Sequence, residues 1–198
     1  MTSFWWIRHA PVIGNNQRCY GNNEVECDLS DINSFKKLSN ILPHNTNVFT
    51  SNLSRTIKTL NATVKHGYKF KKHIKDDRIE EQNLGDYTGM KYQELYTLTK
   101  KFKFSDNNWL LKASHVPPGG ESYINLVTRV TSFIEEMLIS YKNKSIVIFS
   151  HGGPIRAAIS YAINYKNKEV IPLDIENTRI TLIEYNYKKE ARLKLLNY

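Results

Sequence analysis

The chain begins with the segment FWWIRHAP at Phe4–Pro11, an apolar run that ends abruptly in a cation and an imidazole. A segment that is apolar at every position is typical of a strand buried on both faces, as in a parallel sheet. Open α/β sheets bind their ligands at the carboxyl ends of their strands. We therefore expect Arg8 and His9 at a ligand-binding edge, with His9 as a nucleophile and the rest of the chain forming a phosphate site around it.

A second apolar segment, Ile146–Phe149, also leads into a histidine, within the sequence SHGGP at Ser150–Pro154. Adjacent strands of a sheet lie about 4.8 Å apart. If these two strands are neighbours and parallel, His9 and His151 reach one small cavity. A single histidine in such a place is more often a hydrogen-bonded structural residue than a catalyst. Two strands that end in the same way favour a shared chemical site.

Strand and helix patterns alternate along the rest of the chain. Strands are expected near residues 4–7, 48–50, 73–77, 146–149, 179–185 and 191–196, and helices near 32–42, 54–66, 91–104, 122–141 and 154–162. Asn52 or Ser54 is expected to cap the second helix, and Pro154 to take the first position of the last one. The pattern predicts an α/β three-layer sandwich with a mainly parallel central sheet and helices on both faces. We interpret residues 1–198 as one domain, with a small lid-like insertion around 86–120 over the active-site edge.

Composition narrows the classes of protein that the chain can belong to. Its 198 residues, 40% of them hydrophobic, are enough for one sizeable core, and no run approaches the roughly 20 apolar residues of a membrane span. The N-terminus has no basic region followed by a long apolar core, so no secretory signal is expected and the location predicted is cytoplasmic. Cys19 and Cys27 are too few for a disulfide framework and lack zinc spacing, which predicts free thiols and no metal.

The formal net charge of +9 favours anionic partners. The basic residues are dispersed, whereas a nucleic-acid interface needs a clustered basic face with exposed aromatic side chains. We therefore predict a small phosphorylated substrate and neither a nucleic acid nor a membrane as partner. A homodimer is compatible with the sequence, which does not decide the oligomeric state.

Other residues supply what phosphate chemistry requires. Arg55 follows the strand at 48–50, and guanidinium groups match phosphate oxygens in geometry and stay charged. A histidine can accept a phosphoryl group from an alkyl ester only if the leaving alkoxide is protonated, which calls for a carboxylic acid. Glu80 and Glu81 both follow the third strand, and their positions alone do not separate them. The helix that opens near Gly153 adds backbone N–H groups to the same edge.

Five short motifs follow one another along nearly the whole chain. They are Arg8-His9-Ala10, Ser51-x-Leu53-x-Arg55-Thr56, Glu81-x-x-x-Gly85-x-Tyr87-x-Gly89, Pro118-Gly119-Gly120-Glu121-Ser122 and Ser150-His151-Gly152-Gly153. Each is weak alone, but in this order they resemble the histidine phosphatase superfamily, which includes phosphoglycerate mutases and α-ribazole phosphatase. The resemblance implies phosphoryl transfer through a phosphohistidine, without a cofactor or a metal.

The resemblance also implies a role for each matching residue. The catalytic residues would be His9 as nucleophile, Glu81 as general acid, and His151, Arg8 and Arg55 as ligands of the phosphoryl oxygens. The substrate-binding residues would be Arg8, Asn15, Arg55, His151 and Gly152. Glu81 is preferred to Glu80 because it stands four residues before Gly85, as the acid of the family does. The sequence does not decide whether Arg18, Tyr20, Glu121 or Ser122 touches substrate, and the last two are expected first at a helix start.

The chain departs from the family pattern at two places. Ala10 replaces the glycine of the first motif, but Pro11 follows it, and a residue before proline is restricted to extended conformations that alanine adopts as well as glycine. Tyr87-Thr88 replaces Trp-Glu in the acid loop. These changes leave the phosphoryl chemistry intact and prevent the transfer of a specific substrate.

The predicted activity is a metal-independent phosphomonoesterase, with α-ribazole 5′-phosphate as one candidate substrate. A phosphoglycerate mutase is the first alternative, although the short insertion and the short C-terminal end resemble the phosphatase branch more. A non-catalytic module that binds a phosphorylated ligand is the second. The presence of all the phosphate-binding residues and of the acid argues against it.

Overall fold

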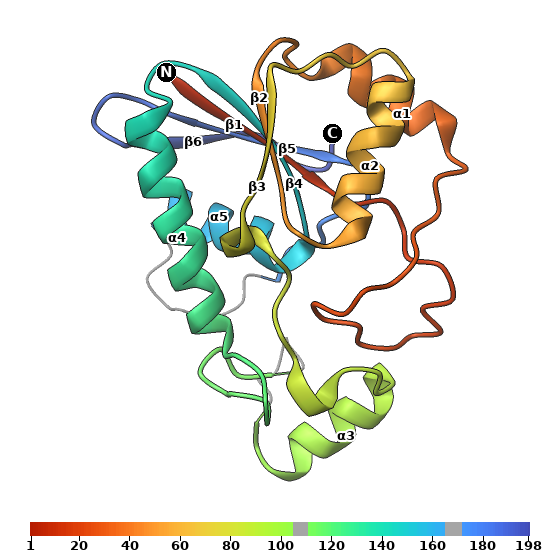
Figure 1. The fold of residues 1–198 in the computed structure, drawn as a ribbon. Helices are drawn as coiled ribbons and strands as arrows, with labels where there is room; N and C mark the ends of the chain where they lie inside the picture. The colour runs from red at the N-terminus through yellow and green to blue at the C-terminus, as the bar shows by residue number, and fades with distance from the viewer. Residues whose placement is uncertain (105–110, 165–171) are drawn as a thin grey trace.

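A six-stranded sheet forms the centre of the protein in the computed structural model, which describes residues 1–104, 111–164 and 172–198 (Figure 1). The strands are β1 (Thr2–Arg8), β2 (Asn47–Thr50), β3 (Lys72–Lys75), β4 (Ser145–Ser150), β5 (Ile180–Tyr185) and β6 (Ala191–Leu195), in the order β3-β2-β4-β1-β5-β6. The first four strands are mutually parallel, and β5 and β6 add an antiparallel hairpin at one edge. The mainly parallel sheet and the closing hairpin are confirmed.

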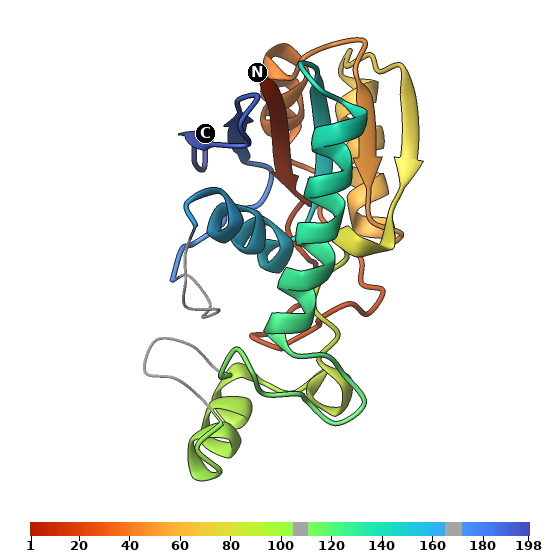
Figure 2. The ribbon, with the colours of Figure 1, turned by 90° about the vertical axis from the view of Figure 1, so that its left-hand side faces the viewer.

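Helices cover both faces of the sheet (Figures 1 and 2). On one face, α1 (Ile32–Ile41) and α2 (Ser54–Lys65) pack on strand residues such as Ile7; on the other, α4 (Tyr123–Ser140) and α5 (Gly152–Ala162) pack on Phe4 and Trp6. Alternate residues of β1 face opposite layers, as the side-chain period of a strand requires. The three-layer sandwich is therefore confirmed. Within the described residues, no helix combines the length and apolar character that crossing a bilayer would need.

The register of the parallel strands decides where the motif residues emerge. Arg8 of β1 pairs with Ser150 of β4, and β4 is also paired with β2. His9 directly follows Arg8, and His151 directly follows Ser150. The two histidines therefore emerge from neighbouring strands at the same edge of the sheet. The expectation that the two histidines share an edge is confirmed.

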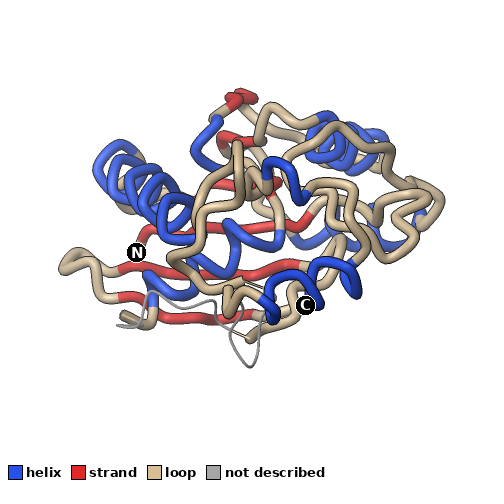
Figure 3. Tube along the Cα trace, turned by 90° about the horizontal axis from the view of Figure 1, so that it is seen from below, coloured by secondary structure: helices blue, strands red, loops and turns tan. Residues whose placement is uncertain are grey.

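Residues of the predicted insertion lie beyond the carboxyl ends of the parallel strands (Figure 1), and from below loops and helices are seen in front of the strands (Figure 3). A short 3₁₀ helix, η1 (Asp77–Ile79), follows β3 and packs against α4, and the chain then forms η2 (Gly85–Tyr87) and α3 (Tyr92–Lys101) in the insertion. A small apolar cluster of Cys19, Tyr87, Leu95 and Leu111 packs this segment against the loop that follows β1. Residues 105–110, part of the predicted insertion, lie outside the described residues.

The predicted capping of α2 is wrong. The N-cap residue is Leu53, and the cap hydrogen bond comes from a distant part of the chain: the Glu24 carboxylate accepts from the Ser54 backbone N–H at 3.0 and 3.2 Å. The Asn52 side chain instead donates to Glu80. A carboxylate satisfies the free N–H groups of a helix start as well as a local side chain does, and a local pattern cannot show it.

The predicted start of α5 is also wrong, by two residues. The helix begins at Gly152, which makes Pro154 its third residue. Proline is tolerated there because the first N–H groups of a helix have no partner within the helix. The earlier start places the N–H groups of Gly152 and Gly153 at the edge where the histidines emerge.

The packing of α4 on the sheet generates a stability prediction. Phe133 is fully buried, with its ring centroid 6.0 Å from that of Trp6 and 5.4 Å from that of Phe49. Phe133→Ala should lower the free energy of unfolding by about 3–5 kcal/mol, because it leaves a cavity in the core. On the same helix Ile139 is 73% exposed, and Ile139→Ala should cost less than about 0.5 kcal/mol. Urea denaturation of both variants tests this, and equal losses would contradict the packing described.

Candidate active site

His9 presents a nitrogen lone pair that no described residue occupies. The side chain is completely buried, and its Nδ1 lies 2.7 Å from the carbonyl oxygen of Ala10. A carbonyl oxygen can only accept, so Nδ1 carries the proton and Nε2 carries the lone pair. Nε2 is buried without a hydrogen-bond partner among the described residues. This is the tautomer that a nucleophilic histidine needs.

The backbone around His9 is held by two residues that the sequence analysis did not single out. The Ala10 N–H donates to Thr59 Oγ1 at 2.8 Å, and Asn177 Nδ2 donates to the His9 carbonyl at 2.7 Å. Ala10 does not have the positive φ that would demand glycine. The prediction that alanine fits this position is therefore confirmed.

His151 has a defined tautomer too. Its ring centroid lies 5.1 Å from that of His9. Arg55 Nε donates to His151 Nδ1 at 3.2 Å, so Nε2 carries the proton and donates to Ser51 Oγ at 2.8 Å. The two histidines therefore differ: one has a free lone pair, and the other is bonded at both nitrogens.

Arg55 is a buried cation rather than a surface one. No part of it is exposed, and its guanidinium donates to the carbonyls of Asn23 at 2.7 Å and Gly21 at 2.9 Å. The ring of Tyr20 lies under it, 5.2 Å from the guanidinium carbon. The loop after β1 thus supplies hydrogen-bond acceptors that offset the free-energy cost of burying this charge. A buried cation beside two histidines is a ready site for an anion.

Burial and positive neighbours keep both histidines neutral. For His9, burial is the larger cause and the charges of Arg55 and Arg8 are the smaller ones, and together they hold its pKa well below 6.5. The pKa of His151 is held well below 6.5 for the same reasons, again with burial first. Both effects disfavour the protonated form. His9 is consequently unprotonated at neutral pH.

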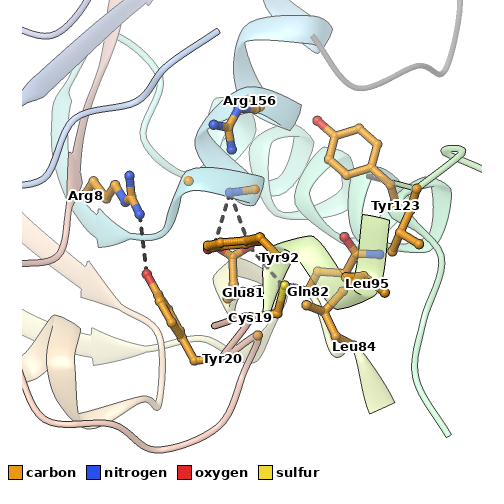
Figure 4. A pocket seen from close by; sticks show the side chains of 14 residues that line it. Arg8, Cys19, Tyr20, Glu81, Gln82, Leu84, Tyr92, Leu95, Tyr123 and Arg156 are labelled. Carbon is orange, nitrogen blue, oxygen red and sulfur yellow. Dashed lines mark hydrogen bonds between the residues drawn. The ribbon is translucent and has the colours of Figure 1, made fainter. Parts of the chain in front are cut away.

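A cavity of about 340 Å³ is lined by Arg8 and Gly152, the chain neighbours of His9 and His151, whereas His9, His151 and Arg55 themselves are not among its lining residues (Figure 4). One part of its lining is polar: Arg8, Tyr20, Gln82, Glu81, Gly152, Gly153 and Arg156. The other part is largely apolar or aromatic: Cys19, Leu84, Tyr92, Leu95, Leu111 and Tyr123. The cavity therefore has an end suited to an anion and an end suited to an apolar or planar group.

The structure separates the two candidate acids. Glu81 lines the cavity, and its two carboxylate oxygens accept from the Gly153 N–H at 3.2 and 3.3 Å (Figure 4). The positive end of the α5 dipole faces this carboxylate. Glu80 accepts instead from Asn52 at an exposed position and does not line the cavity. The geometry thus agrees with Glu81, and not Glu80, as the acid.

Two residues of the loop after β1 lie away from the cavity. Asn15, predicted to assist phosphate binding, is not among the lining residues, and its side chain contacts Tyr92. Arg18 donates to the Gly89 carbonyl at 2.6 Å and so ties the loop to the insertion. Tyr20 does line the cavity, with its hydroxyl 3.4 Å from Arg8. The phosphate-binding role of Asn15 stays a prediction.

Arg156 is one of the cavity residues that the sequence does not single out, and the only charged one among them in the described lining. Its Nε donates to the Leu173 carbonyl at 2.7 Å, and the side chain reaches the cavity from α5. The available signal was its spacing: residues four apart on a helix lie on the same face, and Arg156 follows Gly152 by four. A side chain at Gly152 would crowd it, since a Cβ there would lie 3.1 Å from Arg156 Nη1.

The cysteines are both free and buried, as predicted. Burial raises the pKa of Cys19, which lines the cavity, to about 12, so its thiol stays protonated at neutral pH. Among the described residues, no three His, Cys, Asp or Glu side chains gather as metal ligands would.

Several curated proteins are similar in sequence to this chain. Phosphoserine phosphatase 1 of Hydrogenobacter thermophilus is 28% identical over 123 residues, which cover 62% of this chain and 57% of that protein. A 2,3-bisphosphoglycerate-dependent phosphoglycerate mutase of Cytophaga hutchinsonii is 26% identical over 145 residues, 71% of this chain and 66% of the mutase. The chain spans only about a third of the length of some curated relatives, as in a bifunctional protein of Mycobacterium tuberculosis, where the share is 33%.

Solved structures show the same fold. The α-ribazole phosphatase from Shigella flexneri matches with a TM-score of 0.79 and 20% identity, over 99% of this chain and 96% of that one. A mycobacterial glucosyl-3-phosphoglycerate phosphatase also gives a TM-score of 0.79, with 19% identity over 98% of each chain. The sequence model described as histidine phosphatase superfamily (branch 1) matches residues 4–198. Since that match spans almost the whole chain, the protein belongs to the histidine phosphatase superfamily.

Proposed function

We propose that the protein is a phosphomonoesterase that works through a phosphohistidine on a small phosphorylated metabolite. The observation that carries the proposal is the His9 Nε2 lone pair, buried and without a partner among the described residues, beside two arginines and a second histidine. A neutral nucleophile surrounded by fixed positive charge suits attack on a phosphate dianion.

In the first half of the reaction, the phosphate is held by Arg8, Arg55 and His151, whose Nε2–H turns from Ser51 Oγ to a phosphoryl oxygen. His9 Nε2 attacks phosphorus as the bond to the leaving oxygen breaks, and Glu81 gives its proton to that oxygen. The ring of His9 gains positive charge in this step. The hydrogen bond from its Nδ1–H to the Ala10 carbonyl oxygen stabilises that charge. The arginines keep their charge throughout and stabilise the transition state.

In the second half, water hydrolyses the phosphohistidine. The Glu81 carboxylate accepts a proton from the water as its oxygen attacks phosphorus, and the bond between phosphorus and Nε2 breaks. His9 regains its lone pair, Glu81 regains its proton, and inorganic phosphate leaves. Side chains supply all the positive charge in this scheme, so we propose that it needs no metal ion.

The cavity suggests the kind of leaving group. Its volume suits a small metabolite, and its apolar end, formed by the loop after β1 and the insertion, suits an apolar or planar group. α-Ribazole 5′-phosphate, which combines a phosphate with a flat ring system, is one candidate, and the name of the Shigella flexneri relative supports it. We propose a cytoplasmic metabolite, not a nucleic acid, as the partner.

A phosphoglycerate mutase is the second candidate, favoured by the Cytophaga hutchinsonii relative. Incubation with 3-phosphoglycerate, with and without 2,3-bisphosphoglycerate, separates the two. Free phosphate from a panel of phosphate monoesters is the result expected here. Formation of 2-phosphoglycerate in place of phosphate would assign the mutase activity.

Removal of the nucleophile should abolish turnover. His9→Ala should lower kcat for 4-nitrophenyl phosphate at least about 10³-fold, because no other described side chain offers a lone pair at this position. His44→Ala is the matched control: His44 lies in the turn after α1, bonded to the Ser39 carbonyl, and its loss should leave turnover unchanged. Acid quenching during turnover should trap a phosphorylated enzyme that the His9 variant lacks. Wild-type rates in His9→Ala would refute the mechanism.

The low pKa of His9 predicts how activity depends on pH. The reaction needs neutral His9, and a lowered pKa keeps the ring neutral as pH falls through 6.5. The acid limb of kcat/KM, corrected for the ionisation of the substrate, should therefore lie below pH 6.5. A limb at or above 6.5 would show that burial and Arg55 do not depress the pKa as described.

Chelation tests the proposal that no metal takes part. Dialysis against excess EDTA should leave kcat and KM for 4-nitrophenyl phosphate unchanged, because the charges of Arg8 and Arg55 neutralise the phosphate. A loss of activity that added Mg²⁺ or Zn²⁺ restores would overturn this part of the proposal.

A further inference from the structure

Arg129, on α4, binds the backbone of the segment that carries Glu81. One guanidinium nitrogen, Nη1, donates to the carbonyls of Arg78 at 2.8 Å and Glu80 at 2.7 Å. The other, Nη2, donates to the carbonyl of Glu81 itself at 3.1 Å. Three backbone carbonyls within the four residues 78–81 are thus tied to one side chain of a core helix. Neither the sequence motifs nor the proposed mechanism uses this arginine.

Glu121 completes the arrangement from the other side. It forms a two-pronged ion pair with Arg129, at 2.7 Å to Nη2 and 3.2 Å to Nε. The same carboxylate accepts from the Asn83 N–H at 3.1 Å. The Glu121 backbone N–H donates to the Asn83 carbonyl at 2.9 Å, and its carbonyl accepts from Gln82 at 2.9 Å. Glu81 therefore lies between backbone groups that are fixed on both sides.

The segment before α4 also packs directly on the segment after Glu81. The Asp86 N–H donates to the Pro118 carbonyl at 2.9 Å. A Cβ at Gly120 would lie 2.5 Å from the Asn83 carbonyl oxygen, and one at Gly85 would overlap the Pro118 carbonyl. Only glycines allow this approach. The proline-glycine motif and the acid-loop motif thus form one docked unit.

We propose that Arg129, oriented by Glu121, is a positioning residue that directs the Glu81 carboxyl toward the leaving oxygen of the substrate. The inference rests on the proposed function, since it concerns the acid of that reaction. Displacement of a catalytic group by about 1 Å can cost about 10²-fold in rate. Arg129 therefore determines how poor a leaving group the enzyme can expel.

The test compares leaving groups, because only poor ones need an acid. Arg129→Gln should lower kcat/KM for an alkyl phosphate such as butyl phosphate about 10²-fold. For 2,4-dinitrophenyl phosphate, whose leaving group departs without a proton, kcat/KM should change less than about 3-fold. The quantity is kcat/KM because it reports formation of the phosphohistidine and excludes its hydrolysis, which also uses Glu81. Arg129→Lys keeps the positive charge but loses the several N–H donors of the guanidinium. Its kcat/KM for butyl phosphate should lie between those of the wild type and Arg129→Gln.

Two further variants make the result specific. Arg78→Gln removes another arginine beside α4, one whose side chain pairs with Asp76 and Glu136 and does not bind the acid loop. Arg78→Gln should change kcat/KM by the same factor for both substrates, as any merely structural effect would. Glu81→Gln removes the acid itself and should give the largest fall in kcat/KM for butyl phosphate relative to the dinitrophenyl ester. Adding Arg129→Gln to Glu81→Gln should not increase this difference between the substrates.

The outcomes separate the inference from the function on which it rests. If Glu81→Gln discriminates between the substrates and Arg129→Gln slows both equally, the positioning role is wrong and the acid stands. If Glu81→Gln itself does not discriminate, the acid assignment is wrong and the positioning role falls with it. Selective loss of butyl phosphate turnover in Arg129→Gln, in a variant that still hydrolyses the dinitrophenyl ester, supports the proposal and shows that the protein has folded.

Discussion

The site depends on the parallel pairing of β1 with β4, in which Arg8 lies opposite Ser150. A shift of this register by one residue would move every side chain of β1 to the other layer, and Phe4 and Trp6 would leave the core they share with α4. The packing of these two large side chains against α4 therefore specifies the register, and the register places His9 beside His151. The chemistry of the edge is positioned by the packing of the interior.

Burial then gives these residues their electrostatic character. A buried arginine is costly unless its donors are satisfied, and the carbonyls of Gly21 and Asn23 satisfy Arg55. The same burial, with the charge of Arg55, keeps His9 neutral. The loop after β1 thus does two things: it holds the cation, and through Tyr20 it lines the cavity. Cation and neutral nucleophile exist side by side because burial, and after it the charge of Arg55, lowers the pKa of His9.

Much of the site could be predicted because its residues follow strands. The apolar runs before His9 and His151 indicate buried parallel strands, and such strands end at one edge whatever their order. Glu81 could be distinguished from Glu80 only by resemblance, and the structure gives the physical reason: Gly153 faces one carboxylate and Asn52 binds the other. The cap of α2 could not be predicted, because its acceptor, Glu24, is 30 residues away.

The sequence by itself determined the layers of the fold, the two histidine-bearing strand ends and the residue types of a phosphate site, since periodicity and strand ends are local properties. Only the tertiary structure decided that Arg156 reaches the cavity and that Arg129 and Glu121 hold the acid loop. These contacts join residues tens of positions apart through single side-chain hydrogen bonds. Such bonds leave no periodic trace in a sequence, because they depend on the distance between atoms that folding alone brings together.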